Sequence, residues 1–386
     1  MRKVCLLGAS GSIGRQTLDV MSKNPNDFSL VSFSVGHQTR KIRKIVNDFP
    51  SVKYICVGKK SKATYFQRKY PSIKFFYGDS GLLEIINKDV DLVVNALVGF
   101  VGLAPTLKSL KEDKILCLAN KESLVVGGEL VNNLLNEGHG KLYPIDSEHS
   151  ALKKCLLVDD KNIDKVMLTA SGGAFRKLSR EQLKNVTPED ALKHPTWKMG
   201  PKITIDCATM INKAFELIEA YYLFGIEYKQ LGIKLHDESY IHSYIVYKDG
   251  LMRLDAGKPD MRKPIKFALY ECDIPFGTVT ANSLDEFKDL HFHDFDIKRY
   301  PIVKWAEVVV KEKGTYGAVF NASNEVAVRA FLNHEIPFLA IEEIVDKLMK
   351  EHKNISNPTF EKIEEIDKKT RKNALILVKE RRESND

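Results

Sequence analysis

Two carboxylates separated by one residue follow a short apolar run in residues 144–150 (PIDSEHS). If residues 142–145 form a β-strand, Asp146 and Glu148 point to the same face, because strand side chains repeat every second residue. Carboxylates that share a face repel each other, and a hard divalent cation relieves the repulsion. The spacing therefore predicts a metal site, and the alternative is a solvated acidic turn.

A second group combines an amide, an ammonium and a carboxylate. In residues 205–216 (IDCATMINKAFE), Asn212, Lys213 and Glu216 occupy positions i, i+1 and i+4, so a helix would bring them together near one side. Asn212 and Lys213 could bind a phosphate, and Glu216 could ligate a metal. The alternative is a helix surface with an i,i+3 Lys–Glu pair, although the apolar residues among 215–218 indicate that part of this helix is buried.

Similar residue types recur in residues 119–123 (ANKES), at the end of the apolar run 115–119. Ligand-binding groups in open α/β sheets gather at the carboxyl ends of the strands. This segment is therefore a candidate part of the same site.

The elements at the N-terminus predict a dinucleotide cofactor. The apolar run 4–7 reads as a buried parallel strand, and residues 8–14 (GASGSIG) lead from it into an apolar helix. Gly8, Gly11 and Gly14 form a variant of the dinucleotide fingerprint, in which the backbone approaches a pyrophosphate at the helix N-terminus.

The end of the second predicted strand, 28–35, favours NADP over NAD. Residues 36–41 (GHQTRK) contain no acidic residue to bind a ribose 2′-hydroxyl. Instead, His37, Arg40 and Lys41 could face a 2′-phosphate.

These segments belong to a series of motifs that runs through nearly the whole chain. The series is GASGSIG at 8–14, ANKESLV at 119–125, DSEHSA at 146–151, TASGGAF at 169–175, HPTWKMG at 194–200, DCATMINKAFE at 206–216, IHS at 241–243, KPDMR at 258–262 and ASNEVAV at 322–328. In this order it resembles the 1-deoxy-D-xylulose 5-phosphate reductoisomerase family. That family makes 2-C-methyl-D-erythritol 4-phosphate for isoprenoid synthesis by the non-mevalonate pathway.

The resemblance implies a role for individual residues. The metal ligands would be Asp146, Glu148 and Glu216. The substrate-binding residues would be Lys121, Ser147, Glu148, Ser171, His194, Trp197, Cys207, Asn212, Lys213 and Glu216. The NADPH-binding residues would be Ser10, Gly11, Ser12, Ile13, Gly36, His37, Gln38, Asn120, Glu122, Met199, Gly200 and Met261. Trp197 and Met199 would lie on a flap that closes over the substrate.

The implied mechanism needs a divalent cation, Mg or Mn, because both suit carboxylate oxygens. The cation would chelate ketone and hydroxyl oxygens of the sugar phosphate and stabilise charge during migration of a C–C bond. NADPH would then reduce the branched aldehyde phosphate. Alongside the metal ligands and Lys121, His149 and His242 are candidates for proton transfer, with a scaffold role as the alternative for both.

The sequence departs from the family pattern at several positions. Cys207 stands where a phosphate-binding serine is customary, and a thiol is the weaker hydrogen-bond donor. His37 and Gln38 replace a basic–Asn pair. Residues 236–239 read His-Asp-Glu-Ser instead of His-Pro-Gln-Ser, and the sequence offers no physical reason for this exchange. Ala214 replaces a common glycine and favours the helix.

The expected fold is α/β, with a Rossmann-like dinucleotide-binding domain, an α+β catalytic domain with an open sheet, and a small C-terminal helical domain. The predicted strands are 4–7, 28–35, 54–57, 92–96, 115–119 and 142–145 in the first domain, and 166–169, 203–205, 233–236, 241–247 and 251–254 in the second. We expect NADPH binding in 1–145, metal and substrate binding in 146–285, a connector over 286–304 and a helical domain over 305–386. The cluster HFHDFD within the connector superficially resembles a metal site, but a solvated linker is the preferred interpretation.

Composition limits the other classes of function. The chain has 386 residues and a net charge of +8, but its lysines are spread out and form no basic tract of the kind that binds nucleic acid. Six cysteines without a CxxC pair are typical of reduced thiols in the cytoplasm. We expect no leader segment and no membrane span, and the resemblance implies a homodimer.

Two other classes remain open. A different NADP-dependent sugar-phosphate or semialdehyde reductase would keep the glycine turn but would not need three metal-binding carboxylates. A non-catalytic, cofactor-sensing protein would have little reason to keep Asp146, Glu148, Glu216 and Lys213 together.

Overall fold

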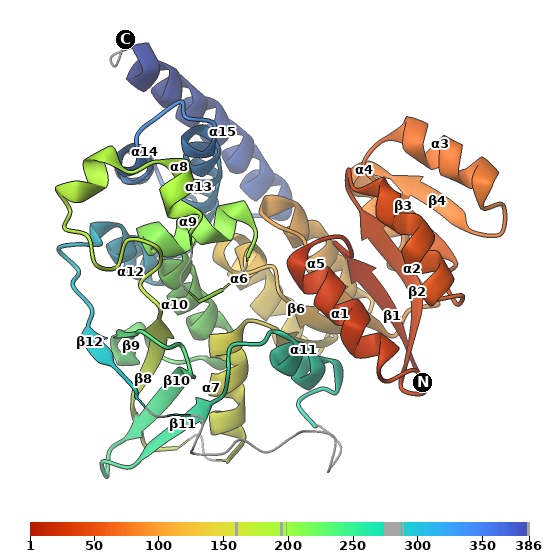
Figure 1. Ribbon diagram of the computed structural model, residues 1–386, viewed down its shortest axis with the longest axis horizontal. Helices are drawn as coiled ribbons and strands as arrows, with labels where there is room; N and C mark the ends of the chain where they lie inside the picture. The colour runs from red at the N-terminus through yellow and green to blue at the C-terminus, as the bar shows by residue number, and fades with distance from the viewer. Residues whose placement is uncertain (159–160, 194–195, 198, 274–286, 288, 384–386) are drawn as a thin grey trace. The chain divides into compact units, whose positions relative to one another are not determined.

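The computed structural model describes residues 1–158, 161–193, 196–197, 199–273, 287 and 289–383. These residues divide into two compact units, each assembled from segments that are distant in sequence (Figure 1). The first unit comprises residues 1–123, 130–150 and 260–278, and the second comprises 124–129, 151–259 and 279–386.

A seven-stranded parallel sheet forms the centre of the first unit. Its strands are β1 Arg2–Leu7, β2 Phe28–Val35, β3 Tyr54–Val57, β4 Lys74–Tyr77, β5 Leu92–Asn95, β6 Ile115–Leu118 and β7 Lys141–Pro144. The order is β4-β3-β2-β1-β5-β6-β7, and each neighbouring pair is parallel. The central strands are mostly apolar and buried, because helices cover both faces of such a sheet. The order reverses between β1 and β5, and ligands bind outside the carboxyl ends of the strands at such a point.

The helices of this unit connect successive strands, as expected for doubly wound α/β. They are α1 Ser12–Ser22, α2 Ile42–Asp48, α3 Lys60–Lys69, α4 Gly78–Glu84, α5 Leu103–Lys111 and most of α6 Glu122–Asn136. The fold class is therefore confirmed. Strand β4 was not predicted from the sequence; it is short, at the sheet edge and only half-buried, so its apolar signal is weak.

One helix of the first unit comes from far along the chain. Helix α11, Arg262–Leu269, belongs to the segment that the sequence analysis assigned to the catalytic domain, but it packs beside α1. The Arg2 guanidinium donates to the Leu269 carbonyl oxygen over 2.6 Å, and the ring of Tyr270 stands edge-on to Phe28 with centroids 5.1 Å apart. The packing of α11 on the first unit is a tertiary contact, and no local sequence pattern predicts it.

A five-stranded sheet forms the second unit's β layer. Its strands are β8 Ile163–Ala170, β9 Leu231–His236, β10 Ile241–Tyr247, β11 Met252–Ala256 and β12 Phe292–Asp294, in the order β11-β10-β8-β9-β12. Only the β8–β9 pair among these is parallel. Buried and half-buried residues alternate along β10, so this strand presents one face to the interior.

Strand β12 corrects one expectation. It lies inside the predicted connector 286–304, within the HFHDFD cluster, and pairs with β9 instead of forming a solvated linker. Its three residues are exposed, so the strand has no apolar pattern that sequence reasoning could detect.

The second unit also contains the predicted helical region at the C-terminal end. The helices of the second unit are α8 Pro188–Ala191, α9 Pro201–Thr209, α10 Ile211–Phe224, α12 Lys304–Glu312, α13 Tyr316–Leu332, α14 Phe338–Glu351 and α15 Phe360–Glu383. The last four of these form the predicted C-terminal helical region. The strand predicted at 203–205 is wrong, because these residues lie in α9. Pro201 at the first helical position and Gly200 as N-cap start that helix, and a three-residue apolar run cannot distinguish strand from helix.

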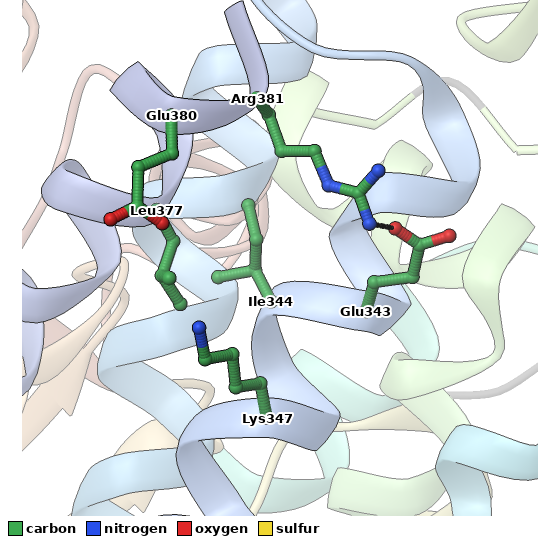
Figure 2. A pocket seen from close by; sticks show the side chains of 6 residues that line it. All are labelled: Glu343, Ile344, Lys347, Leu377, Glu380 and Arg381. Carbon is green, nitrogen blue, oxygen red and sulfur yellow. Dashed lines mark hydrogen bonds and ion pairs between the residues drawn. The ribbon is translucent and has the colours of Figure 1, made fainter. Parts of the chain in front are cut away.

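A surface recess of about 230 Å³ lies between α14 and α15 (Figure 2). The residues lining it are Glu343, Ile344, Lys347, Leu377, Glu380 and Arg381. Arg381 pairs with Glu343 across it, and none of the predicted site residues is among its lining residues.

Candidate active site

The glycine turn after β1 has the geometry of a pyrophosphate cradle. Gly8 has φ +83°, and a Cβ placed there would lie 2.5 Å from the carbonyl oxygen of Ala96. A Cβ on Gly14 would lie 2.3 Å from the Gly8 carbonyl oxygen, and the Gly11 amide donates to that same oxygen over 3.0 Å. Because Gly11 is the N-cap of α1, Ser10, Gly11, Ser12 and Ile13 surround the helix N-terminus, where anions bind. These residues fit a dinucleotide.

A cluster of cations lies beside this turn. The Lys41 ammonium donates to the carbonyl oxygen of Ser10 over 3.0 Å. Desolvation, together with the nearby charges of Arg15 and Arg40, lowers the pKa of Lys41. A bound anion would relieve this repulsion, so the cluster suits a ribose 2′-phosphate. The predicted cofactor residues Gly36, His37 and Gln38 lie exposed in the loop between β2 and this cluster.

Asn120 organises the loop at the carboxyl end of β6. Its amide nitrogen donates to the carbonyl oxygens of Leu97 and Gly99 and to the carboxylate of Glu122 over 2.9–3.1 Å. Its amide oxygen accepts from both the backbone and the hydroxyl of Ser123. The Asn120 side chain thus holds the loop around residues 97–99 in place, with Glu122 beside it.

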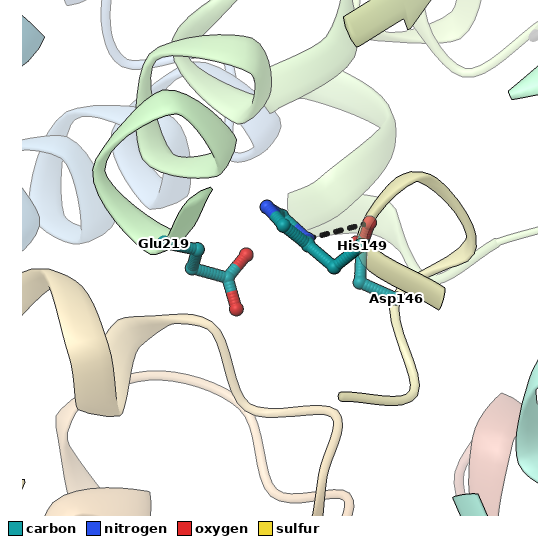
Figure 3. A group of neighbouring side chains, drawn as sticks. All are labelled: Asp146, His149 and Glu219. Atoms are coloured by element: carbon teal, nitrogen blue, oxygen red, sulfur yellow. Dashed lines mark hydrogen bonds and ion pairs between the residues drawn. The ribbon is translucent and has the colours of Figure 1, made fainter. Parts of the chain in front are cut away.

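Asp146 is the centre of a charged group in the first unit. Its Oδ2 lies 3.0 Å from Lys121 Nζ, and its Oδ1 accepts from the Glu148 amide over 3.2 Å. Figure 3 shows the ring of His149 directed at the same carboxylate, with Nδ1 3.1 Å from Oδ1. The His149 side chain is fully buried, which favours the scaffold interpretation for this residue over proton transfer.

The path from sequence to this arrangement differs from the expectation. Strand β7 ends at Pro144 and helix α7, Ser147–Val158, begins just after Asp146. Asp146 therefore caps a helix N-terminus and Glu148 lies in its first turn, so the argument from strand alternation is wrong. Ser147 Oγ donates to the Glu148 carboxylate. The start of a helix, and not one face of a strand, therefore positions Asp146 and Glu148.

Helix α10 groups Asn212, Lys213 and Glu216, as their spacing predicts. Asn212 Nδ2 donates to Glu216 Oε1 over 2.5 Å, and the Lys213 ammonium pairs with the other oxygen. All three residues are buried, so the alternative of an exposed Lys–Glu pair on a helix surface is wrong. The helix begins after Met210, whose φ of +66° turns the chain from α9 into α10.

The end of β8 meets both helices. The Lys213 ammonium donates to the Thr169 carbonyl oxygen, and Gly172 and Gly173 after it have φ values of +79° and +66°. A Cβ on Gly173 would lie 2.7 Å from the carbonyl oxygen of Cys207 on α9. The structure therefore gathers Ser171, Cys207 and Lys213, three of the residues expected to bind the substrate phosphate.

The remaining predicted residues are spread over both units. The rings of Trp197 and His242 on β10 lie 6.1 Å apart. Met199 precedes α9, and Gly200 is its N-cap. Met261 precedes α11 in the first unit and packs against the core there. His194 lies outside the described residues.

Sequence reasoning missed three polar residues near these groups. Glu219, also drawn in Figure 3, follows Glu216 by three residues on α10 and is buried, a spacing that could have found it. Thr169 and Arg176 flank the Ser171 turn within or directly after a quoted motif. Their bonds depend on tertiary structure.

The parallel sheet with its glycine turn, joined to a unit with buried carboxylates and cations, defines the class of dinucleotide-dependent α/β oxidoreductases. Comparisons with known proteins narrow this class. Three family models match the chain. The model for 1-deoxy-D-xylulose 5-phosphate reductoisomerase matches residues 4–128, and the model for the C-terminal domain of that enzyme matches residues 142–224. The model described as the DXP reductoisomerase C-terminal domain matches residues 256–373. The chain belongs to the 1-deoxy-D-xylulose 5-phosphate reductoisomerase family.

Similar proteins agree over nearly the full length. The chain is 45% identical over 378 residues to the 1-deoxy-D-xylulose 5-phosphate reductoisomerase of Bacillus subtilis strain 168, covering 96% of this chain and 98% of that one. A reductoisomerase of Bacillus thuringiensis subsp. konkukian is 44% identical with the same coverage. A crystal structure of DOX-P reductoisomerase with NADPH, fosmidomycin and magnesium superposes with a TM-score of 0.91 at 33% identity over 98% of both chains. The Zymomonas mobilis enzyme with NADPH gives 0.89 at 33% identity, covering 98% of this chain and 99% of that one.

Proposed function

We propose that this protein converts 1-deoxy-D-xylulose 5-phosphate to 2-C-methyl-D-erythritol 4-phosphate, using NADPH and a divalent cation. Among the structural observations, the buried group of Asn212, Lys213 and Glu216 beside the Ser171 turn carries the proposal. It combines phosphate-binding and metal-binding chemistry at one point of the second unit. A buried ammonium and carboxylate are costly to desolvate, and ligand binding gives a reason to retain them.

The substrate phosphate would be bound by Ser171, Asn212 and Lys213, with Cys207 nearby. Lys213 supplies charge, while the hydroxyl and amide supply directed hydrogen bonds. Binding energy from this non-reacting phosphate can be used to orient the reacting carbons and to order Trp197 over the substrate.

Asp146, Glu148 and Glu216 would bind the cation. Carboxylate oxygens suit both Mg and Mn, and three related reductoisomerase structures contain magnesium. When bound, the cation would polarise the substrate ketone and stabilise developing negative charge. Lys121 and His149 hold the Asp146 carboxylate in orientation, and His242 is the remaining candidate for proton transfer.

The first unit would bind NADPH through the turn at 8–14. Two related reductoisomerase structures contain NADPH, which supports the choice of cofactor. The cofactor supplies a hydride to the rearranged aldehyde. Arg15, Arg40 and Lys41 would distinguish NADPH from NADH by their charge.

We further propose a homodimer formed along β11. This strand is at the edge of its sheet, and it exposes Met252 and Leu254, with Leu251 just before it. An exposed apolar sheet edge readily pairs with another chain. Light scattering of the protein should give twice the chain mass, and Leu254→Lys should shift it toward the monomer.

A reducing, cytoplasmic location is consistent with the cysteines. All six are free thiols, and four of them are buried. Among the described residues, no helix is long and apolar enough to cross a membrane.

The decisive assay follows NADPH absorbance with 1-deoxy-D-xylulose 5-phosphate, with and without Mg. We expect oxidation of NADPH to require both the substrate and the cation, and fosmidomycin to inhibit it. Turnover that persists after chelation would favour a different NADP-dependent reductase, and absence of turnover despite NADPH binding would favour a cofactor-sensing protein.

A further inference from the structure

The exchange of Pro-Gln for Asp237-Glu238 has a structural consequence in the turn between β9 and β10. The Asp237 amide donates to the His291 carbonyl oxygen over 3.3 Å, a bond that proline could not make. Tyr240 N donates to His236 Nε2, so the proton of this buried ring is on Nδ1, which lies 3.0 Å from the same carbonyl oxygen. The turn is thus bonded directly to His291, the residue before β12.

Both carboxylates of this turn face cations or histidines. Glu238 accepts from the backbone amide of His291 over 3.0 Å and lies 2.7 Å from its Nδ1, and this contact raises the pKa of His291. Asp237 Oδ1 lies 3.5 Å from His293 Nε2 and 3.6 Å from Arg176 Nη1. Asp237 therefore lies between β12 and Arg176.

Arg176 links this turn to the Ser171 turn. Its Nη1 donates to the carbonyl oxygen of Ser171 over 3.3 Å and to that of Asp237 over 3.1 Å. A Cβ on Gly172 would lie only 2.7 Å from Arg176 Cβ, so the glycine turn also packs directly on the arginine stem. The backbone that carries Ser171 is held by one guanidinium group, which is held in turn by Asp237.

We propose that Asp237 is a positioning residue for the substrate phosphate, acting through Arg176 on the Ser171 turn. The inference rests on the proposed function, in which Ser171 binds that phosphate. The side chains of Arg176 and Asp237 are 22% and 27% exposed, so their contact is only partly screened by solvent. A small displacement of the turn weakens the Ser171 contact equally in the ground state and the transition state, which raises KM. Asn212 and Lys213 still bind the phosphate and supply the energy that orients the substrate, so kcat stays nearly unchanged.

The test measures steady-state kinetics of the full-length protein with Mg and NADPH. Arg176→Gln removes both carbonyl contacts and should raise KM for the sugar phosphate about tenfold. Asp237→Asn keeps the backbone carbonyl and loses only the charge, so about threefold is expected. The inhibition constant of inorganic phosphate should rise in parallel, while KM for NADPH stays constant.

Two comparisons separate positioning from general destabilisation. Because Asp237 acts through Arg176, the double variant should match Arg176→Gln alone and not multiply the two effects. The matched control is Asp346→Asn on α14. The Asp346 side chain is 28% exposed and forms an ion pair with Lys304 of α12, so the substitution removes a comparable charge from a different place. That control should leave KM unchanged.

The proposal is overturned if both variants lower the melting temperature but leave KM and phosphate inhibition at the wild-type values. It is also overturned if the effects of Arg176→Gln and Asp237→Asn multiply independently. Wild-type protein that fails to turn over the sugar phosphate would instead refute the proposed function, so the two failures are distinguishable.

Discussion

The Nζ of Lys121 lies 3.0 Å from Oδ2 of Asp146, and the two side chains are only 9% and 15% exposed. Because the pair is largely removed from water, each charge depends on the other. Lys121→Gln should therefore lower the free energy of unfolding by about 2 kcal/mol, because Asp146 loses its compensating cation but keeps the Glu148 amide and His149 as partners, and a hydrogen bond to a charged group contributes roughly 1.5–3 kcal/mol. Thermal or denaturant unfolding measures this loss.

If Asp146 is a metal ligand, Mg should restore part of that stability. Saturating Mg should raise the melting temperature of Lys121→Gln by more than it raises that of wild type, because the cation replaces the lost ammonium charge. The control is Lys141→Gln, which removes an exposed lysine paired with Glu271 in the same unit. An equal response to Mg in all three proteins would contradict metal binding at Asp146.

Glu216→Gln should reduce kcat by at least about a hundredfold, because an amide is a poorer ligand for a hard cation than a carboxylate. NADPH affinity, measured by fluorescence titration, should change little. Glu342→Gln is the matched control: this glutamate is also buried and paired with a cation, Arg180, but lies on α14. Near-normal turnover of Glu216→Gln at ordinary Mg concentrations would remove Glu216 from the ligand set.

The cations near Ser10 should decide the choice of cofactor. Wild type should have a higher kcat/KM with NADPH than with NADH, and Arg40→Gln combined with Lys41→Gln should remove most of the difference. A charge-assisted hydrogen bond to a phosphate contributes roughly 1.5–3 kcal/mol, which the double substitution would remove. Lys44→Gln, on the exposed part of α2, should leave the preference intact. A preference that survives the double substitution would show that this cluster does not bind the 2′-phosphate.

Gly11 and Gly14 of the turn at 8–14 should respond differently to substitution by alanine. A Cβ on Gly14 would lie 2.3 Å from the Gly8 carbonyl oxygen and 2.6 Å from Ala9 Cα, so Gly14→Ala must displace backbone. It should destabilise the first unit and abolish NADPH binding. Gly11→Ala meets only one atom, at 3.4 Å, so its fold should remain and only its NADPH affinity should fall. Calorimetry measures the stability of both variants, and titration measures their NADPH affinity. A greater loss of stability and affinity in Gly11→Ala than in Gly14→Ala would refute the prediction.

Cys207 should be accessible to thiol reagents and protected by substrate. It is partly exposed on α9, whereas Cys5, Cys56, Cys117 and Cys155 are buried. Burial raises the pKa of the Cys5 and Cys56 thiols to about 12, which makes them unreactive at neutral pH. N-ethylmaleimide should thus modify Cys207, and sugar phosphate should slow the reaction.

The conservative change Cys207→Ser should lower KM for the sugar phosphate by a few-fold at most, since a neutral hydrogen bond contributes about 0.5–1.5 kcal/mol.

In the N-ethylmaleimide experiment, mass spectrometry of the labelled peptides identifies the modified cysteine. Labelling of Cys207 at the same rate with and without substrate would exclude it from the phosphate pocket.

The sequence alone determined the features that depend on near neighbours in the chain. Strands β2, β3 and β10 have the bounds that their apolar runs predicted, and the i, i+1, i+4 spacing placed Asn212, Lys213 and Glu216 together on α10. The strand–glycine turn–helix at the N-terminus also follows from local pattern, because the turn requires residues without a Cβ.

Tertiary structure decided the contacts between distant segments. Lys121 meets Asp146 from 25 residues away, α11 joins the first sheet from beyond residue 260, and Arg176 holds Asp237 across 61 residues. Strand β12 exists because β9 offers it a pairing edge, and residues 203–205 are helical because their context overrides a weak preference. Hydrophobic periodicity reports only which face of an element is buried; the partner of that face is chosen by packing of the whole chain.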